Sequence, residues 1–207
     1  MGAMGSKNST TAKRADALRS IEAIVQAAAE CLGRNPEASL SEIARAAGVG
    51  RVTLYGHFAS RAEVVDAAMS RALDRGNEVL DTVDMTGDPR LALARYVAAG
   101  WHLVDQARAL LAAAQRELSA GRIRELHAEP AARVEALVAR GRVEGVFRTD
   151  LSIAWMVNVL HSVMHSAAEE IRAGRLTSDR AADHITATVL AAFTPPGKPV
   201  PDTSGGS

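Results

Sequence analysis

The stretch SLSEIARAAGVGRVTLYGHF, residues 39–58, decides the fold expected for this chain. Ser39 and Glu42 stand at the spacing of a capping box, in which a hydroxyl and a carboxylate each accept from one free N–H group at a helix start. Gly48 then interrupts the helical pattern. Two short helices are therefore expected, over about 39–47 and 51–58. Two short helices joined by a turn that contains glycine form a helix-turn-helix.

This stretch also holds a local excess of positive charge. No acidic residue stands between Ile43 and Ala62, whereas the segment contains Arg45, Arg51 and Arg61. The whole chain carries 24 basic and 24 acidic residues, so its net charge is zero. A local basic window favours phosphate contacts, because neutralised phosphates release their counterions. A solvated pair of helices in an all-α bundle has the same pattern, and charge and spacing alone support both interpretations equally.

Outside this stretch the composition favours helices over strands. The chain of 207 residues contains 47% hydrophobic but only 3% aromatic residues, and no long alternating run. Apolar spacings of three and four, with cap signals at Ser60-x-x-Glu63 and Asp88-Pro89, predict further helices. These are expected over about 12–34, 60–83, 89–106, 108–119, 128–144, 151–173 and 178–193. The prediction is an all-α fold of about nine helices.

The sequence also argues against several other classes of protein. No run of 18 apolar residues is present, which excludes a transmembrane helix, and no apolar segment near the start has the length of a secretory signal. One cysteine, Cys31, excludes a disulfide framework and multi-cysteine zinc motifs. No G-x-S-x-G, P-loop, H-E-x-x-H or dinucleotide glycine pattern occurs, so an enzyme is not expected.

The segment IARAAGVGRVTLYGHFASRAEVV, residues 43–65, resembles the DNA-binding motif of the TetR (tetracycline repressor) family. The usual form of that motif is I-A-x-x-A-G-V-S-x-x-T-L-Y-x-H-F-x-S-K-x-x-L. The matching residues are Ile43, Ala44, Ala47, Gly48, Val49, Thr53, Leu54, Tyr55, His57, Phe58 and Ser60. The resemblance is clear from about Ile21 to Met69, and beyond it only the helical layout and the length agree.

Three positions depart from the family motif. Gly50 replaces the usual serine, so the second short helix has no hydroxyl cap, at a cost of a few tenths of a kcal/mol. Val52 replaces a small residue beside the groove, where its methyl groups suit a thymine methyl. Arg61 replaces the usual lysine and keeps the charge. These departures do not argue against DNA binding.

The resemblance implies seven residues that contact DNA. Ser39 would cap its helix and touch a phosphate. The expected base or near-base contacts are Arg51, Val52 and Thr53. The expected phosphate contacts are Tyr55, His57 and Arg61. Four further basic residues near the start of the chain could form an arm that reaches the backbone or minor groove: Lys7, Lys13, Arg14 and Arg19.

The resemblance also implies a division into parts with different roles. The resemblance implies a helix-turn-helix DNA-binding domain (12–60) and a helical regulatory and dimerisation domain (61–193), while composition alone indicates a disordered arm or cloning remnant (1–11) and a disordered tail (194–207). The last two long helices, about 151–173 and 178–193, would pair with a second copy in a homodimer. Such a protein would be a cytoplasmic repressor, released from a palindromic operator by an unidentified small molecule.

Eight polar or aromatic residues on apolar helices are candidates for a ligand pocket. They are Trp101, His102, Gln115, Arg116, Trp155, Asn158, His161 and His165. A core position is the competing interpretation for each tryptophan. His161 and His165 are four residues apart and share a helix face, which suits a pocket wall or a dimer seam better than a metal site, and no cofactor is expected. A helical dimeric ligand-binding or interaction protein without sequence-specific DNA binding is the alternative function.

Overall fold

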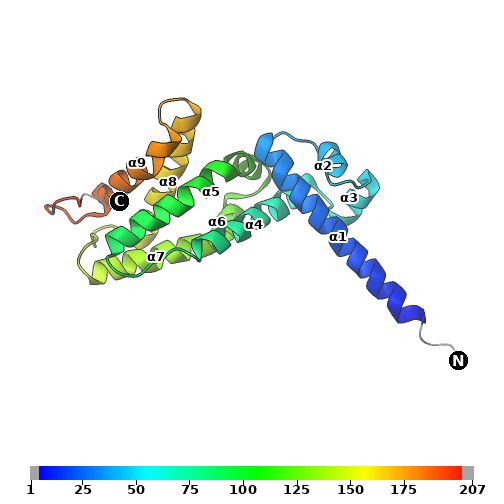
Figure 1. Cartoon of the computed structure of the whole chain (residues 1–207), viewed down its shortest axis with the longest axis horizontal. Helices are drawn as coiled ribbons and strands as arrows, with labels where there is room; N and C mark the ends of the chain where they lie inside the picture. Colours follow the sequence, from blue (N-terminus) through cyan, green and yellow to red (C-terminus); the bar gives the residue numbers. More distant parts are fainter. Residues whose placement is uncertain (1–4, 202–207) are drawn as a thin grey trace. The chain divides into compact units, whose positions relative to one another are not determined.

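The computed structural model describes residues 5–201 of the chain. Within this range it contains nine α-helices and no strand, which confirms the all-α prediction (Figure 1). The helices are α1 (Gly5–Arg34), α2 (Leu40–Ala46), α3 (Arg51–His57), α4 (Arg61–Leu80), α5 (Pro89–Glu117), α6 (Ala120–Leu126), α7 (Ala128–Val143), α8 (Ile153–Arg172) and α9 (Ser178–Phe193). None of these helices is both long and apolar enough to cross a membrane.

The chain forms two compact units. The first contains residues up to Leu73 together with Ala109–Ile123, and the second contains Asp74–Arg108 together with the residues from Arg124 onward. Helices α4, α5 and α6 therefore contribute residues to both units. The expected boundary at residue 60 falls inside the first unit, and the functional division into 12–60 and 61–193 remains a prediction.

The predicted capping box at the start of α2 is present. The Ser39 N–H donates to Glu42 Oε2 at 2.7 Å, and the Glu42 N–H donates to Ser39 Oγ at 3.2 Å. These hydrogen bonds satisfy N–H groups that a helix start leaves without a partner in the helix. Ser39 itself has extended backbone angles, so it also turns the chain from the preceding loop into α2.

Gly48 forms the turn between α2 and α3. Its φ of 68° lies in the left-handed region that residues with a Cβ atom avoid. The Gly48 N–H donates to the Arg45 carbonyl at 3.2 Å, and the Val49 N–H donates to the Ala44 carbonyl at 3.0 Å. The last carbonyls of α2 are therefore bonded as the chain reverses toward α3.

Helices α2 and α3 pack against α1. The three helices contribute fully buried apolar side chains, which are Ile24, Ala28, Leu32, Ile43 and Leu54. Burial of apolar area stabilises such a cluster by roughly 25 cal/mol per Å². The remaining faces of α2 and α3 point to solvent, so the two short helices are fixed from one side only.

Helix α1 begins earlier than the sequence indicated. It starts at Gly5 rather than near Ala12, so residues 5–11 of the expected disordered arm are helical, and residues 1–4 lie outside the described part. The segment GSKNSTT has weak helix propensity, which is why its composition indicated an arm. Extending an existing helix avoids the cost of nucleation, so weak formers can continue a helix that is fixed further along.

The boundaries of α4, α5 and α6 also differ in part from expectation. Ser60 Oγ accepts from the Glu63 N–H at 3.2 Å as predicted, but the Glu63 carboxylate accepts from the Ala59 N–H instead of that of Ser60. Pro89 opens α5 as predicted, yet the expected break near Ala107 is wrong because α5 is one helix. Helix α6 was not predicted, since none of its residues is buried and it carries no apolar stripe.

The second unit has its own apolar core, formed by residues of α5, α7, α8 and α9. Trp101, Met156, Leu160 and Phe193 are among its most deeply buried side chains. Helix α9 ends at Phe193, and the predicted tail contains a turn in which the Lys198 N–H donates to the Pro195 carbonyl at 3.1 Å. Residues 202–207 of that tail lie outside the described part.

Candidate nucleic-acid interface

Helix α3 presents a continuous exposed surface. Arg51, Thr53, Val52 and Tyr55 all point to solvent, with Val52 88% and Tyr55 56% exposed. Leu54, by contrast, is fully buried against the neighbouring helices. A large apolar side chain left almost fully exposed on an anchored helix is a sign of an interaction surface. The structure therefore brings together, on one exposed face, the residues expected to contact bases and Tyr55.

The start of α3 carries charge that the protein does not neutralise. Arg51 makes no ion pair with any other residue in the range 5–201. Gly50 occupies the cap position, and it makes no side-chain hydrogen bond because glycine has no side-chain acceptor. An exposed guanidinium at the first turn of a short helix has the reach and the donors to contact the edge of a base or a phosphate.

Ser39 and His57 lie at the edges of this surface. The Ser39 hydroxyl accepts from the Glu42 N–H and donates to its carboxylate at 2.8 Å, so it is already engaged within the protein. The hydrogen bonds from Ser39 lower the pKa of Glu42 and keep it charged beside the basic window. His57 is the last residue of α3 and is half-buried.

Arg61 is placed differently from the other predicted phosphate contacts. Its guanidinium donates to Glu117 Oε1 at 2.9 Å, to the Pro36 carbonyl at 2.9 Å and to the Ala38 carbonyl. The side chain is only 25% exposed. Arg61 therefore connects the start of α4 to the loop before α2 and to the last turn of α5, and a phosphate would have to displace these acceptors.

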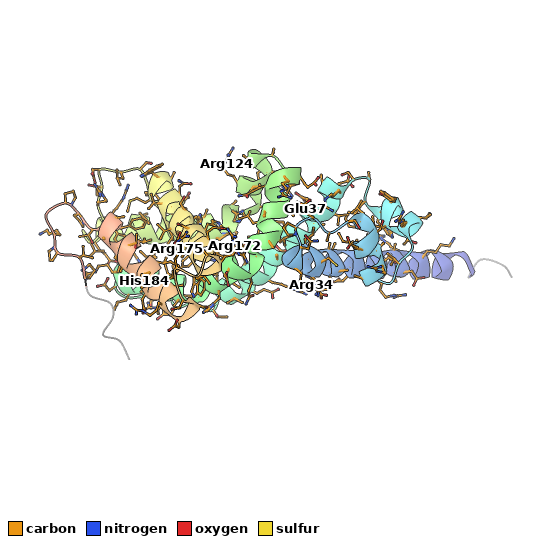
Figure 2. The ribbon with its side chains drawn as sticks, turned by 90° about the horizontal axis from the view of Figure 1, so that it is seen from above. Arg34, Glu37, Arg124, Arg172, Arg175 and His184 are labelled. Atoms are coloured by element: carbon orange, nitrogen blue, oxygen red, sulfur yellow. The ribbon has the colours of Figure 1, made fainter. Side chains whose placement is uncertain are left out.

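Two further ion pairs join elements of the first unit. Arg116, at the end of α5, pairs with Glu37 in the α1–α2 loop, which begins just after Arg34 (Figure 2). Arg122 on α6 donates to both carboxylate oxygens of Asp66 on α4, at 2.6 and 3.0 Å. These contacts brace the elements on both sides of the helix-turn-helix. Sequence reasoning missed them because each partner lies far away along the chain.

The eight candidate ligand residues do not form one group. Trp101 is buried in the core of the second unit, and His102 is exposed with its ring 4.5 Å from that of Trp101. Gln115 and Arg116 belong to the first unit and are exposed. Trp155 and Asn158 are exposed on α8. The assignment of these residues to a ligand pocket remains a prediction.

His161 and His165 do lie together and are partly buried. Burial, followed by the nearby imidazoles of His127 and His165, lowers the pKa of His161 to about 4. Burial and His127 likewise lower the pKa of His165. His127, which precedes α7, was not predicted because nothing near it in the sequence signals its partners. Across residues 5–201, no group of three or more potential ligands is arranged to hold a metal ion.

A hollow of about 370 Å³ lies elsewhere in the second unit. It is lined by Arg142 of the last turn of α7, by residues of the α7–α8 link such as Arg148 and Asp150, and by Pro195 and Pro196 after α9. Arg148 pairs with Asp150 through two hydrogen bonds, and this pairing lowers the pKa of Asp150 to about 2. None of the eight candidate ligand residues lines this hollow.

The fold and the exposed second helix define a helix-turn-helix protein of the DNA-binding type. Residues 24–68 match the model of the "Bacterial regulatory proteins, tetR family". The repressor LfrR of Mycolicibacterium smegmatis is 35% identical over 79 residues, which are 38% of this chain and 42% of LfrR, so the match spans less than half of that relative. The regulator NfxB of Pseudomonas aeruginosa is 27% identical over 168 residues, covering 78% of this chain and 87% of NfxB.

Solved structures show the same fold over most of the chain. A putative tetR family regulator from Shewanella superposes with a TM-score of 0.68 at 17% identity, covering 84% of this chain and 98% of that one. LfrR from Mycobacterium smegmatis, solved in complex with proflavine, gives a TM-score of 0.65 at 24% identity, covering 84% of this chain and 96% of that one.

Residues 24–68 therefore form a DNA-binding domain of the tetR family of bacterial regulatory proteins. The family that this domain matches consists of DNA-binding transcriptional regulators, which are not enzymes. The predicted recognition segment, residues 43–65, lies within the matched range and coincides with α2, the turn at Gly48, α3 and the start of α4.

Proposed function

We propose that the protein is a homodimeric repressor that binds a palindromic operator in double-stranded DNA and is released by a small molecule. The observation that carries this proposal is the exposed face of α3, whose side chains are polar or basic except for Val52, on a helix anchored by Leu54. A helix held from behind and exposed in front can enter the major groove without unfolding its support.

The contacts follow from the chemistry of the exposed side chains. Arg51 suits the two acceptors of a guanine, and Val52 suits a thymine methyl, with Thr53 beside them. Tyr55 and His57 are assigned to phosphates, and Ser39 contributes mainly through its capping box. Arg61 is proposed to hold the helix-turn-helix in place through its three acceptors, and only secondarily to meet a phosphate.

Dimerisation is proposed through α8 and α9, within the predicted ranges 151–173 and 178–193. Met156 and Leu160 of α8 and Ile185 of α9 point into the core, which leaves the opposite faces for a partner. Trp155 is 54% exposed on the first turn of α8 and would be covered there. Two copies are required because a palindrome presents two half-sites about one helical turn, roughly 34–36 Å, apart.

Release by a small molecule is proposed from the family and from LfrR, whose structure contains proflavine. A ligand acts only through its different affinity for the two states of the protein. The ion pairs that brace α4, α5 and α6 around the helix-turn-helix are contacts that such a ligand could shift. We further propose a cytoplasmic location, where the operator would be.

The test is a binding-site selection on random duplexes with the full-length protein, followed by affinity measurements on the selected site. Arg51→Ala is expected to weaken that affinity by about 5- to 150-fold for each half-site, from roughly 1–3 kcal/mol per bidentate base contact, and to relax the preferred base at one position of each half-site. Tyr55→Ala is expected to weaken selected and random duplexes alike. Arg124→Ala is the matched control, because Arg124 is an exposed arginine of α6 and lies outside the proposed dimer helices.

Two outcomes of these measurements would contradict the proposal. If sequence-specific binding survives both Arg51→Ala and Tyr55→Ala, α3 is not the recognition helix. If the wild-type protein recovers no preferred sequence and binds all duplexes with strong salt dependence, the basic window acts only by phosphate attraction.

A further inference from the structure

Helix α1 is longer than the surface against which it packs. Its buried side chains begin at Ile24, and between Lys13 and Ala23 no side chain is buried. The N-terminal part of α1 runs beyond α2 and α3 in Figure 1. At 1.5 Å per residue, the segment from Gly5 to Ser20 extends about 22 Å.

The charges of α1 are divided between its two halves. Residues 5–19 contain four basic residues and one acidic residue, a net charge of +3. Residues 20–34 contain Glu22, Glu30 and Arg34, a net charge of −1. The half that reaches beyond the buried part of the helix is therefore the basic half, within a chain whose overall net charge is zero.

Two of these basic side chains have no ionic partner. Lys13 and Arg14 are exposed and make no ion pair with another residue between 5 and 201, whereas Arg19 pairs with Asp16. A helix without tertiary contacts is marginally stable in water, more so when its residues have weak helix propensity. An external polyanion that neutralises the exposed charges would supply the stabilisation that the protein does not.

The side chains of this segment favour DNA over a membrane as the polyanion. Binding in a membrane interface requires an apolar face opposite the basic one. Leu18 is the only large apolar side chain from residue 5 to residue 20, and the others are small, polar or charged. Helix α1 also packs against α3, so the basic extension and the exposed face of α3 belong to the same compact unit.

We propose that the N-terminal extension of α1, residues 5–19, binds the phosphate backbone of the same DNA duplex that α3 reads. This inference rests on the proposed function, since it assigns a second DNA contact to the same regulator. The contact carries no sequence information, and it adds affinity that depends on salt.

The test compares the full-length double variant Lys13→Gln, Arg14→Gln with the wild type on the selected operator duplex. The logarithm of the binding constant is measured against the logarithm of salt concentration. Removing one phosphate contact is expected to make this line shallower by about 0.9, so the slope of the double variant should fall by about 1.8 per protomer. Arg124→Gln with Lys198→Gln removes the same charge from exposed positions of the second unit, outside α8 and α9, and is expected to leave the slope unchanged.

The preferred sequence is measured in parallel, because it separates this inference from the proposed function. A reduced slope with the same preferred sequence supports a phosphate contact by α1. If the slope of the double variant equals that of the wild type while both read the same sequence, the inference about α1 is wrong and the role of α3 stands. An equal reduction in the control pair would also overturn it, since the effect would then be one of total charge. Unchanged circular dichroism and Tm exclude unfolding as the cause.

Discussion

Gly141 in α7 offers a sharp test of packing in the second unit. A Cβ atom on Gly141 would lie 2.6 Å from Cε2 and 2.9 Å from Cγ of Phe147, and closer still to Cδ2. Phe147 is 2% exposed and packs edge-on against Phe193, with ring centroids 5.8 Å apart. Its ring therefore cannot yield to the new methyl group without disturbing the end of α9.

The sign of the Gly141→Ala effect follows from two opposing contributions. Replacing glycine by alanine inside a helix ordinarily stabilises by about 1 kcal/mol. Overpacking a closed core costs about 1–3 kcal/mol, and expelling the phenylalanine ring costs about 3–5 kcal/mol. The distance to Phe147 is too short to be relieved by a small shift, so we expect a net destabilisation of about 2 kcal/mol. For a chain of this length that change lowers Tm by about 4–8 °C.

Gly76 in α4 provides the matched control. A Cβ atom there would meet only Leu103 Cδ1 at 3.6 Å, an ordinary contact, so Gly76→Ala is expected to raise stability by about 0.5–1 kcal/mol. Both variants are measured by thermal and urea unfolding at one protein concentration, because the proposed dimerisation would shift the apparent stability. A second change, Phe147→Leu, should make Gly141→Ala less costly. If the two alanine variants were equally stable, the tight packing of Phe147 on Gly141 would be wrong.

Three further predictions address caps, buried polar contacts and acid sensitivity. Ser39→Ala should destabilise the first unit by about 1 kcal/mol, measured by hydrogen exchange in α2. Arg133→Met should cost about 1–2 kcal/mol in urea unfolding, because the buried Asn77 side chain is deprived of a donor at 2.7 Å. The folded pKa of His161 is about 4 against an ordinary 6.5, so its unfolded form binds a proton first as pH falls. Stability should therefore decline below about pH 6.5, by about 2 kcal/mol at pH 5, and His161→Gln should flatten that decline.

The sequence predicted the helix-turn-helix well because its signals are local. The capping box joins residues three apart, and the turn depends on one glycine whose φ of 68° the structure confirms. Apolar spacing within α2 and α3 then identifies which side is buried, and Leu54 is indeed inaccessible. Each of these features is decided within a few residues, so no knowledge of the rest of the fold is needed.

Helix α5 shows why the pattern misled further along the chain. Its buried residues in the second unit include Leu93, Val97 and Trp101, each four positions apart, whereas in the first unit the next buried residue is Leu110. The nine positions from Trp101 to Leu110 correspond to about two and a half helical turns, at 3.6 residues per turn. The apolar stripe therefore moves to the opposite side of one continuous helix. Because the apolar residues change sides, the sequence predicts a break near Ala107. That prediction is wrong, since α5 is one continuous helix.

The candidate ligand residues show what local sequence patterns cannot predict. Polar residues on apolar helices identify positions that could line a pocket, but only the three-dimensional fold decides which of them meet. His161 and His165 share a helix face by spacing, and His127 joins them from a distant segment. At the end of the same helix, Arg172 and Arg175 pair with acidic residues of α8, and His184 Nδ1 donates to the Arg180 carbonyl within α9 at 2.8 Å (Figure 2). These last contacts are local and need no ligand.

The basic surfaces of this chain differ in whether their cations are paired with carboxylates, and not in how many arginines they contain. Arg61 and Arg122 are held by carboxylates of the first unit, and they fix the elements around the helix-turn-helix. Arg51, Lys13 and Arg14 lack such partners among residues 5–201 and are exposed. A protein with no net charge can bind a polyanion if its carboxylates are used elsewhere, because the local field and not the total charge acts within a Debye length of about 8–10 Å. The unpaired cations of α1 and α3 are therefore the groups whose removal should change the dependence of DNA binding on salt.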